Sequence, residues 1–400
     1  MTLLKWPLKS GGLLYFNQTL HHHQKVKLSR VKPYGFSHMP GVSSQIIKMF
    51  YDNSPLINLA KNQQTESIIQ KLAIDNFVTI EQQQIKFTTS FLPGQFDTWL
   101  SYYKLSNQSV ELAPWRAKQI KQSHIAFLNN KNTQAEVAFY NFKHQQQYGS
   151  TPYNKLLTPP QITNFSADQL SQSLNQVLLN SCHDNWFITG AIAISKIEQQ
   201  LIPLIESSQS ICIKNLISRP RLQISSAHLE FNQGKFQKRQ SHGLVNLTID
   251  KNQLFMKQLI QRHFALELTK QTREKGLTYS SGVVVTDSGA DTTLHLFVQT
   301  EINKKLKMGA VVNQIIEQGI SSQQLLTLKA QLTADIKLMN DKNSDLHQQL
   351  ISSIKRQDRF IKPLEMQRWV SSLTVKQANR YFKQALSNNQ LLQLDWLPLE

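Results

Sequence analysis

The sequence predicts an α+β protein of two similar domains, each with an antiparallel sheet covered by helices. The chain of 400 residues is too long for one ordinary core and suggests about two domains. Short strand patterns stand apart from runs of helical patterns, which is typical of α+β domains. The order strand, helix, strand pair, several helices, strand also occurs twice, over about 200 residues each time, which indicates a repeat of architecture.

The first domain is expected to span residues 1–210. Its alternating or wholly apolar stretches predict strands at 13–16, 26–30, 77–80, 85–91 and 186–192. Its amphipathic stretches predict helices at 43–59, 96–148, 166–179 and 196–205. Pro114 fits a helix start and Ser166 fits an N-cap. The run His21-His22-His23 is expected in an exposed turn.

Residues 211–240 are polar, carry Arg219-Pro220 and are expected to form a linker and leading strand. The second domain is expected to span residues 241–400. Its strands are predicted at 244–249, 278–286, 292–300 and 391–396. Its helices are predicted at 254–273, 304–318, 322–339, 344–356, 362–371 and 375–386. Ser321 and Thr374 are natural N-caps for two of these helices.

The formal net charge of +18 fits nucleic acid, an anionic surface or acidic peptides as partners. Lysine and arginine are scattered and no nucleic-acid module is recognisable, so we expect no nucleic-acid function. A basic binding surface would favour acidic or carboxy-terminal peptide segments, but a basic outer surface without a function explains the charge equally well. No apolar run approaches the about 20 residues of a membrane span, so we expect no membrane span.

The amino terminus is too short and interrupted for a signal peptide. The two cysteines, Cys182 and Cys212, cannot make a disulfide framework or a cysteine zinc site. A reducing compartment is therefore the expectation, and the cytoplasm is the expected location. A periplasmic location would fit if the amino terminus is truncated.

The stretch 271–281 is the most informative part of the chain. A long helical pattern ends with Arg273, Gly276 can take the left-handed conformation that ends a helix, and Tyr279 begins a β-rich run. Lys270, Arg273 and Lys275 suit the helix dipole at this end. Taken alone, these residues predict a capped helix followed by one buried tyrosine.

The run Arg-Glu-Lys-Gly-Leu-Thr-Tyr-Ser at 273–280 resembles the substrate-gripping segment of the pitrilysin/insulinase family of zinc metallopeptidases. Further stretches that resemble the family occur in the family's order, at 148–153, 187–192, 297–300 and 319–325. The resemblance implies two similar α+β domains that form a half-shell, and two half-shells that close around a peptide chamber. It also implies that Arg273 and Tyr279 bind the peptide substrate.

In that family one domain supplies His-x-x-Glu-His on a helix and a distant Glu. Both His and the distant Glu bind zinc, and the motif Glu activates a water. This sequence contains no such motif. In its nearest match His38 takes the first position, while Gly41 and Val42 stand where the Glu and the second His would be. A catalytic zinc needs three protein ligands, so His38 is interpreted as a remnant.

Other histidines do not supply the missing zinc ligands. His124, His144 and His183 have no second ligand at helical or short-loop spacing, so we expect them to be structural or surface residues. We therefore expect no catalytic residue, cofactor or metal in this chain, and zinc in a partner half.

The resemblance implies a half of a metalloendopeptidase that is not catalytic on its own. It would bind peptide and close the chamber for a zinc-bearing partner half or subunit in proteolysis. The chain fits either a separate subunit or the carboxy-terminal half of a longer peptidase. The alternative from a different class is a non-proteolytic assembly or scaffold subunit that kept the fold.

Overall fold

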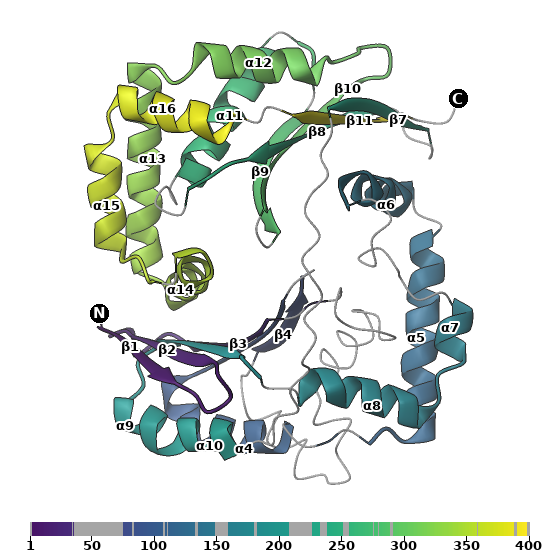
Figure 1. The fold of residues 1–400 in the computed structure, drawn as a ribbon, viewed down its shortest axis with the longest axis vertical. Helices are drawn as coiled ribbons and strands as arrows, with labels where there is room; N and C mark the ends of the chain where they lie inside the picture. The colour runs from purple at the N-terminus through teal and green to yellow at the C-terminus, as the bar shows by residue number, and fades with distance from the viewer. Residues whose placement is uncertain are drawn as a thin grey trace. The chain divides into compact units, whose positions relative to one another are not determined.

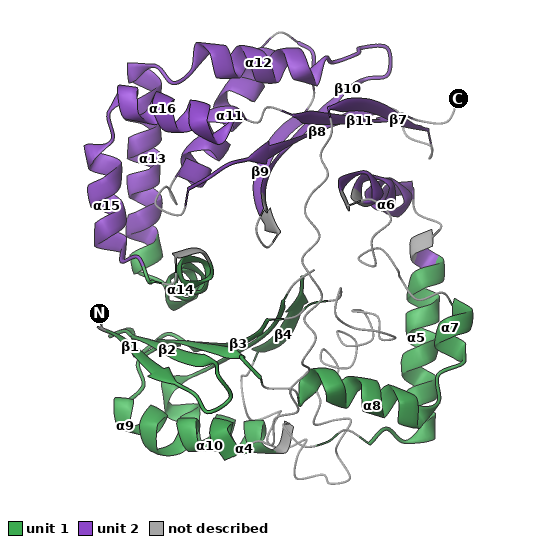
Figure 2. Ribbon diagram, in the orientation of Figure 1, with its two compact units in different colours: residues 1–129, 155–218, 339–360 green, residues 130–154, 219–338, 361–400 purple. Residues whose placement is uncertain are grey.

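The computed structural model describes most of the chain in two compact units. The described residues are 2–33, 35, 75–81, 84–106, 109, 111–132, 135–148, 159–179, 182–207, 226–232, 238–250, 256–274, 276–278, 280–288, 291–357, 359–387 and 390–397. The predicted helix at 43–59 and residues 149–153, which follow the predicted helical region 96–148, lie outside them. Unit 1 holds residues 1–129, 155–218 and 339–360, and unit 2 holds 130–154, 219–338 and 361–400 (Figure 2).

Unit 1 is built on a six-stranded sheet with the strand order β1-β2-β6-β3-β5-β4 (Figure 1). Its strands are β1 (Thr2–Pro7), β2 (Leu13–Gln18), β3 (Val26–Lys32), β4 (Asp75–Ile80), β5 (Ile85–Phe91) and β6 (Asn185–Gly190). Its helices are α4 (Phe96–Ser106), α5 (Pro114–Asn132), α7 (Pro159–Thr163), α8 (Ala167–Leu178), α9 (Ile194–Lys196), α10 (Ile202–Ser207) and α14 (Asn343–Gln357). A π-helical turn, Ile197–Leu201, joins α9 to α10, so the predicted helix at 196–205 is present with one irregular turn.

The core of unit 1 forms because successive residues of each strand face opposite sides of the sheet. Phe16, Phe91 and Ile188 face α4 and the α9–α10 segment, and Phe91 stacks on Trp99 of α4 with ring centroids 4.9 Å apart. Tyr15 faces the other side and packs with α14. Both faces of the sheet are therefore covered.

Unit 2 is built on a five-stranded sheet with the strand order β7-β11-β8-β10-β9 (Figure 1). Its strands are β7 (Ala227–Asn232), β8 (Lys238–Leu247), β9 (Ser280–Ser288), β10 (Asp291–Glu301) and β11 (Leu391–Leu397). Its helices are α6 (Ala135–Tyr148), α11 (Met256–Thr272), α12 (Met308–Gln318), α13 (Ser322–Asn340), α15 (Pro363–Ser372) and α16 (Val375–Ala385).

The two sheets repeat one pairing scheme, which confirms the predicted repeat of architecture. In each unit the last strand, β6 or β11, lies between a parallel neighbour (β2 or β7) and an antiparallel neighbour (β3 or β8). The next two strands follow antiparallel in both units. The sheets are thus mixed, not wholly antiparallel as expected, because β6 runs parallel to β2 and β11 runs parallel to β7.

The compact units are not contiguous in sequence, which differs from the expected domains at 1–210 and 241–400. Helix α14 from the second half of the chain places Leu350, Ile351 and Ile354 on the sheet of unit 1. Helix α6 from the first half places Phe139 on the sheet of unit 2. Strand β7 lies inside the range expected to be the linker and leading strand. Each unit is therefore completed by a helix from the other half of the sequence.

Capping chemistry sets several helix ends as the sequence predicts. The Ser166 side chain accepts from the Gln169 backbone N–H, and Thr374 does the same for Gln377, so both are capping boxes. Ser321 Oγ accepts from the Gln324 N–H at 3.2 Å, at the start of α13. Pro114 is the first residue of α5, where its missing N–H costs nothing.

Cys182 is disulfide-bonded. The sequence has one other cysteine, Cys212, which lies outside the described residues. Disulfide bonds are typical of oxidising compartments. Among the described residues, none of the helices combines the length and the apolar character needed to cross a membrane.

Candidate functional site

Helix α11 carries the predicted substrate-gripping segment to the sheet of unit 2. Its apolar residues Leu259, Phe264 and Leu268 are fully buried, which fixes the helix against the rest of the unit. At its end the Leu277 N–H donates to the Thr272 carbonyl at 2.9 Å, and the Gly276 N–H donates to the Arg273 carbonyl at 3.0 Å. This pair of bonds is a Schellman motif.

The Schellman motif requires a left-handed residue after the helix, which Gly276 provides with φ of 65°. The predicted role of Gly276 is therefore confirmed. The Arg273 side chain is exposed and has no hydrogen-bond partner among the described residues. Tyr279 and His38 both lie outside the described residues, so the convergence of Arg273 and Tyr279 stays a prediction.

The residues on either side of Tyr279 are tied to strand β10. The Thr278 hydroxyl hydrogen-bonds the Gln299 carbonyl, and the Ser280 hydroxyl donates to Gln299 Oε1 at 3.2 Å. The Ser280 N–H also donates to Thr278 Oγ1 at 3.1 Å. The backbone path from the helix end into β9 is thus held by several side chains, as a preorganised binding segment needs to be.

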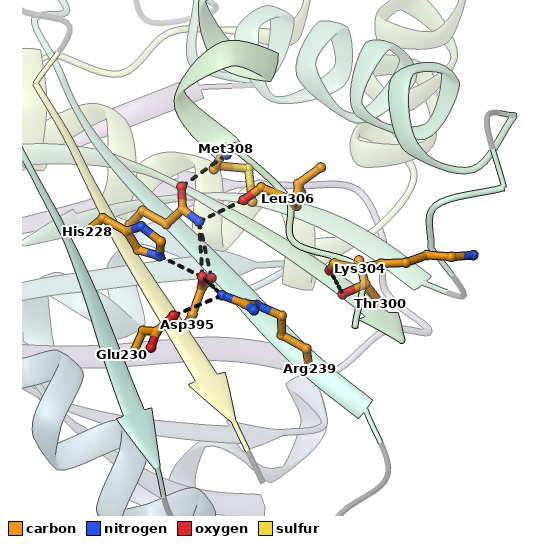
Figure 3. Close-up of polar contacts among 9 residues, drawn as sticks. His228, Glu230, Arg239, Thr300, Lys304, Leu306, Met308 and Asp395 are labelled. Carbon is orange, nitrogen blue, oxygen red and sulfur yellow. Dashed lines mark hydrogen bonds and ion pairs between the residues drawn. The ribbon is translucent and has the colours of Figure 1, made fainter. Parts of the chain in front are cut away.

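A polar network on unit 2 joins three strands and was not predicted from the sequence. His228 and Glu230 come from β7, Arg239 comes from β8, and Asp395 comes from β11 (Figure 3). The buried guanidinium of Arg239 donates to Asp395 and, at 3.4 Å, to Glu230. His228 Nε2 lies 2.7 Å from Asp395 Oδ2, and Gln393 Nε2 donates to the same carboxylate at 3.2 Å.

Electrostatics keeps the Asp395 carboxylate of this network ionised. Burial alone would raise the pKa of Asp395, but the hydrogen-bonding side chains around its carboxylate outweigh burial and hold that pKa below its usual value. Two weak signals in the sequence could have located the network. They are the alternation of polar and apolar residues from Ala227 to Asn232, and the polar Gln393 and Asp395 within an otherwise apolar final strand.

His228, Glu230 and Asp395 offer possible metal-ligand atoms that lie within 4.8 Å of one another. The guanidinium of Arg239 already bonds both carboxylates (Figure 3). Its side chain is 2% exposed, so it cannot swing out to admit a cation. A divalent ion would meet a fixed positive charge, so the group fits an ion network that holds β7 and β8 to β11 better than it fits a metal.

Of the other histidines considered from the sequence, His124 and His183 are not gathered into a site among the described residues, and the side chain of His144 is not among those described. His124 is buried in α5, and burial lowers its pKa to about 4. His183 lies in the turn before β6 with a positive φ of 58°. Neither belongs to the group of potential metal ligands found among the described residues.

Comparison with known proteins identifies the fold. No family model matches the chain, and no curated protein matches it. The periplasmic protease PqqL from Escherichia coli matches 99% of this chain with 45% of its own, at a TM-score of 0.82 and 15% identity. A peptidase M16 inactive domain from Pseudomonas fluorescens matches 100% of this chain with 99% of its own, at a TM-score of 0.79 and 16% identity. A protease from Helicobacter pylori matches 99% of this chain with 99% of its own, at a TM-score of 0.80 and 12% identity.

The fold is therefore that of a two-domain half of the M16 peptidases, the pitrilysin/insulinase family, and the α+β prediction is confirmed. The chain spans about half the length of PqqL. It matches the Pseudomonas fluorescens inactive domain over nearly the whole of both chains.

Proposed function

We propose that the chain is the half of a pitrilysin/insulinase-like endopeptidase that lacks the zinc motif. It binds peptide and closes the chamber for a zinc-bearing partner half. One observation carries this proposal, namely the end-to-end match to an inactive M16 domain by a sequence that contains no His-x-x-Glu-His. The match covers only 45% of PqqL, so the PqqL chain also contains a remainder of about the same length. This supports the proposal of a partner half.

In this proposal Arg273 and Tyr279 hold a peptide carbonyl against the partner's zinc. Zinc would polarise that carbonyl and activate the attacking water from the partner half. A guanidinium offers several fixed donors and a phenol offers one, so together they can orient the carbonyl and stabilise the developing oxyanion. The Schellman turn at Gly276 supports this role, because it lets the chain reverse between Arg273 and β9 within a few residues.

Copurification from the source cell tests the proposal against the scaffold alternative. We expect the chain to bring down a partner with His-x-x-Glu-His, and the complex to cleave peptides in a chelator-sensitive way. Partners without any peptidase motif, and a complex without peptidase activity, would favour the scaffold function.

We also propose an oxidising compartment as the site of action, because Cys182 is disulfide-bonded and such bonds persist outside reducing compartments. Thiol alkylation of freshly lysed cells, followed by mass spectrometry of the peptide that contains Cys182, checks this. We expect Cys182 to be protected from alkylation until a reductant is added. Immediate labelling of Cys182 in the native protein would instead place the chain in a reducing compartment.

A further inference from the structure

Lys143 is a half-buried lysine of α6 with no counter-ion among the residues that the structure describes. Phe139, one turn earlier on α6, stacks on Trp396 of β11 with centroids 5.0 Å apart and lies 4.8 Å from the ring of His242. Residues four apart share a helix face, so Lys143 follows Phe139 over the same sheet. No hydrogen bond or ion pair joins Lys143 to any residue that the structure describes.

Two histidines lie beside this lysine on neighbouring strands. His242 of β8 faces Phe297 of β10, with ring centroids 5.2 Å apart, and its Nε2 atom is buried without a partner. His295 lies two residues from Phe297 on the same face, with Nε2 2.8 Å from Thr286 Oγ1. Burial first, and then the nearby charge of Lys143, lowers the pKa of both histidines to about 3.

The lysine therefore supplies the one positive charge of this group at neutral pH, beside two neutral imidazoles. Burial lowers the pKa of Lys143 to about 8, which reflects the cost of holding an unpaired ammonium away from water. Asp395 cannot serve as its counter-ion. In the strand register Asp395 lies opposite Ser241, so both face one side of the sheet, whereas His242, the next residue after Ser241, faces the other side. Asp395 is also already bonded to Arg239.

The surroundings of the three side chains are partly open to solvent. Val284 of β9 pairs with His295 and is 54% exposed, so this part of the sheet face is open to solvent. Tyr140, next to Phe139 on α6, is 62% exposed. A carboxylate fits such a place, because an ammonium gives it a charge partner and imidazole N–H groups give it further donors.

We propose that Lys143, His242 and His295 form a binding site for a carboxylate of a peptide. This rests on the proposed function in so far as the peptide is a substrate. The carboxylate is either the carboxyl terminus or an Asp or Glu side chain, since the chemistry of both is the same. The site would select acidic or carboxy-terminal segments by one buried contact, not by the overall charge of the chain.

Calorimetric titration of the isolated chain separates the two sources of the carboxylate. In the first comparison, one peptide is titrated as the free acid and as the carboxy-terminal amide. In the second comparison, both peptides are carboxy-terminal amides, and they differ only in carrying Glu or Gln at one internal position. We expect the free acid or the Glu peptide to bind about tenfold more tightly than its uncharged counterpart, as for one charge-assisted hydrogen bond. Equal affinities in both comparisons would overturn the site.

Variants then locate the preference. Lys143→Gln should remove it, while Lys143→Arg should keep most of it, because the positive charge stays. Lys376→Gln, an exposed lysine on α16 of the same unit, is the matched control for charge and should leave the preference intact. A preference that survives Lys143→Gln, or disappears equally in Lys376→Gln, would show that the carboxylate binds elsewhere.

A labelling experiment on the unmutated chain covers the case in which Lys143→Gln fails to fold. A neutral acylating reagent should modify Lys143 more slowly when the carboxylate peptide is present than when the amide is present. Equal rates would contradict the proposal. Neither experiment needs a zinc-bearing partner. Carboxylate binding without reconstituted proteolysis would therefore remove the proposed function and keep the site, and proteolysis without carboxylate preference would do the reverse.

Discussion

His347 Nε2 lies 2.8 Å from Ser29 Oγ, and its Nδ1 lies 3.1 Å from Thr189 Oγ1. The histidine comes from α14 in the second half of the chain, whereas the two hydroxyls belong to β3 and β6 of the first sheet. Burial is the main reason that the pKa of His347 falls to about 3, so the imidazole is neutral in the folded protein. Helix α14 is thus anchored inside unit 1 by uncharged hydrogen-bonding contacts of His347.

Acid should destabilise the protein well above the range where carboxylates protonate. Burial lowers the folded-state pKa of His347, His242 and His295 to about 3 and that of His124 and His263 to about 4. At pH values below the ordinary histidine pKa of about 6.5, these histidines bind protons in the unfolded chain but stay neutral in the folded chain. The free energy of unfolding should therefore fall as pH drops from about 6.5 towards 4, with each fully buried histidine costing on the order of 2 kcal/mol by pH 5.

Urea denaturation between pH 7.5 and pH 4.5 measures this loss. His347→Gln keeps a polar side chain but removes one titrating group, so its stability should depend less on pH than that of the unmutated chain. A stability that is flat across this interval would mean that these histidines are not held neutral in the fold.

Arg273 and Tyr279 should matter to catalysis in the complex and not to folding of the chain. Tyr279→Phe removes only a hydroxyl and should lower turnover with the zinc-bearing partner by roughly ten- to a thousandfold, as for the loss of one oxyanion donor. Arg273→Lys should also lower turnover, because lysine lacks the planar fork. Steady-state peptide cleavage by the reconstituted complex measures both effects.

The same unit supplies a matched control pair. Arg380 Nη2 donates to the hydroxyl of Tyr381 at 3.3 Å on the surface of α16, so Arg380→Lys and Tyr381→Phe repeat the two chemical changes away from the proposed segment. These variants should keep full turnover. If Arg273→Lys and Tyr279→Phe behave like them, the segment is structural.

Gly276→Ala should destabilise the chain through its backbone alone. Its φ of 65° is costly for any residue with a Cβ, by about 1 kcal/mol, yet an added Cβ would meet no atom within 4 Å. Gly282 in β9 is equally open to an added Cβ but has no positive φ. Gly282→Ala should therefore be neutral or slightly stabilising. Equal denaturation midpoints for the two variants would mean that the Schellman turn carries no strain.

The ion network on unit 2 should respond very differently to the loss of its buried and exposed carboxylates. Asp395→Asn leaves the guanidinium of Arg239 buried without its main partner and should cost about 3–5 kcal/mol of unfolding free energy. Glu230 is 45% exposed, so Glu230→Gln should cost less than about 1 kcal/mol. Thermal unfolding with added zinc checks the structural assignment, and a zinc-dependent rise that Glu230→Gln abolishes would contradict it.

Local signals predicted the local structure. Ser166, Thr374 and Gly276 begin or end helices as their side chains and backbone freedom dictate. The strands predicted at 77–80 and 85–91 are present as β4 and β5, which pair antiparallel. The resemblance at 273–280 led to a fold that the structural neighbours confirm, although no sequence comparison detects it.

Features that depend on distant contacts were missed for a physical reason. Nothing in the apolar face of α6 or α14 says which sheet it covers, so both helices were assigned to the wrong neighbour along the chain. Strand β7 is half polar because it is an edge strand whose His228 and Glu230 bond across to Arg239 and Asp395. Read alone, its polarity indicated a linker.

Zinc content and peptide cleavage, measured on the purified chain and on the complex isolated from its source cell, test the proposed role most directly. The chain alone should hold no stoichiometric zinc and cleave no peptide, because its sequence offers no motif with three catalytic zinc ligands. The complex should hold zinc in the partner and cleave peptides until a chelator is added. One tightly held zinc per isolated chain, with chelator-sensitive cleavage, would contradict the role proposed for it.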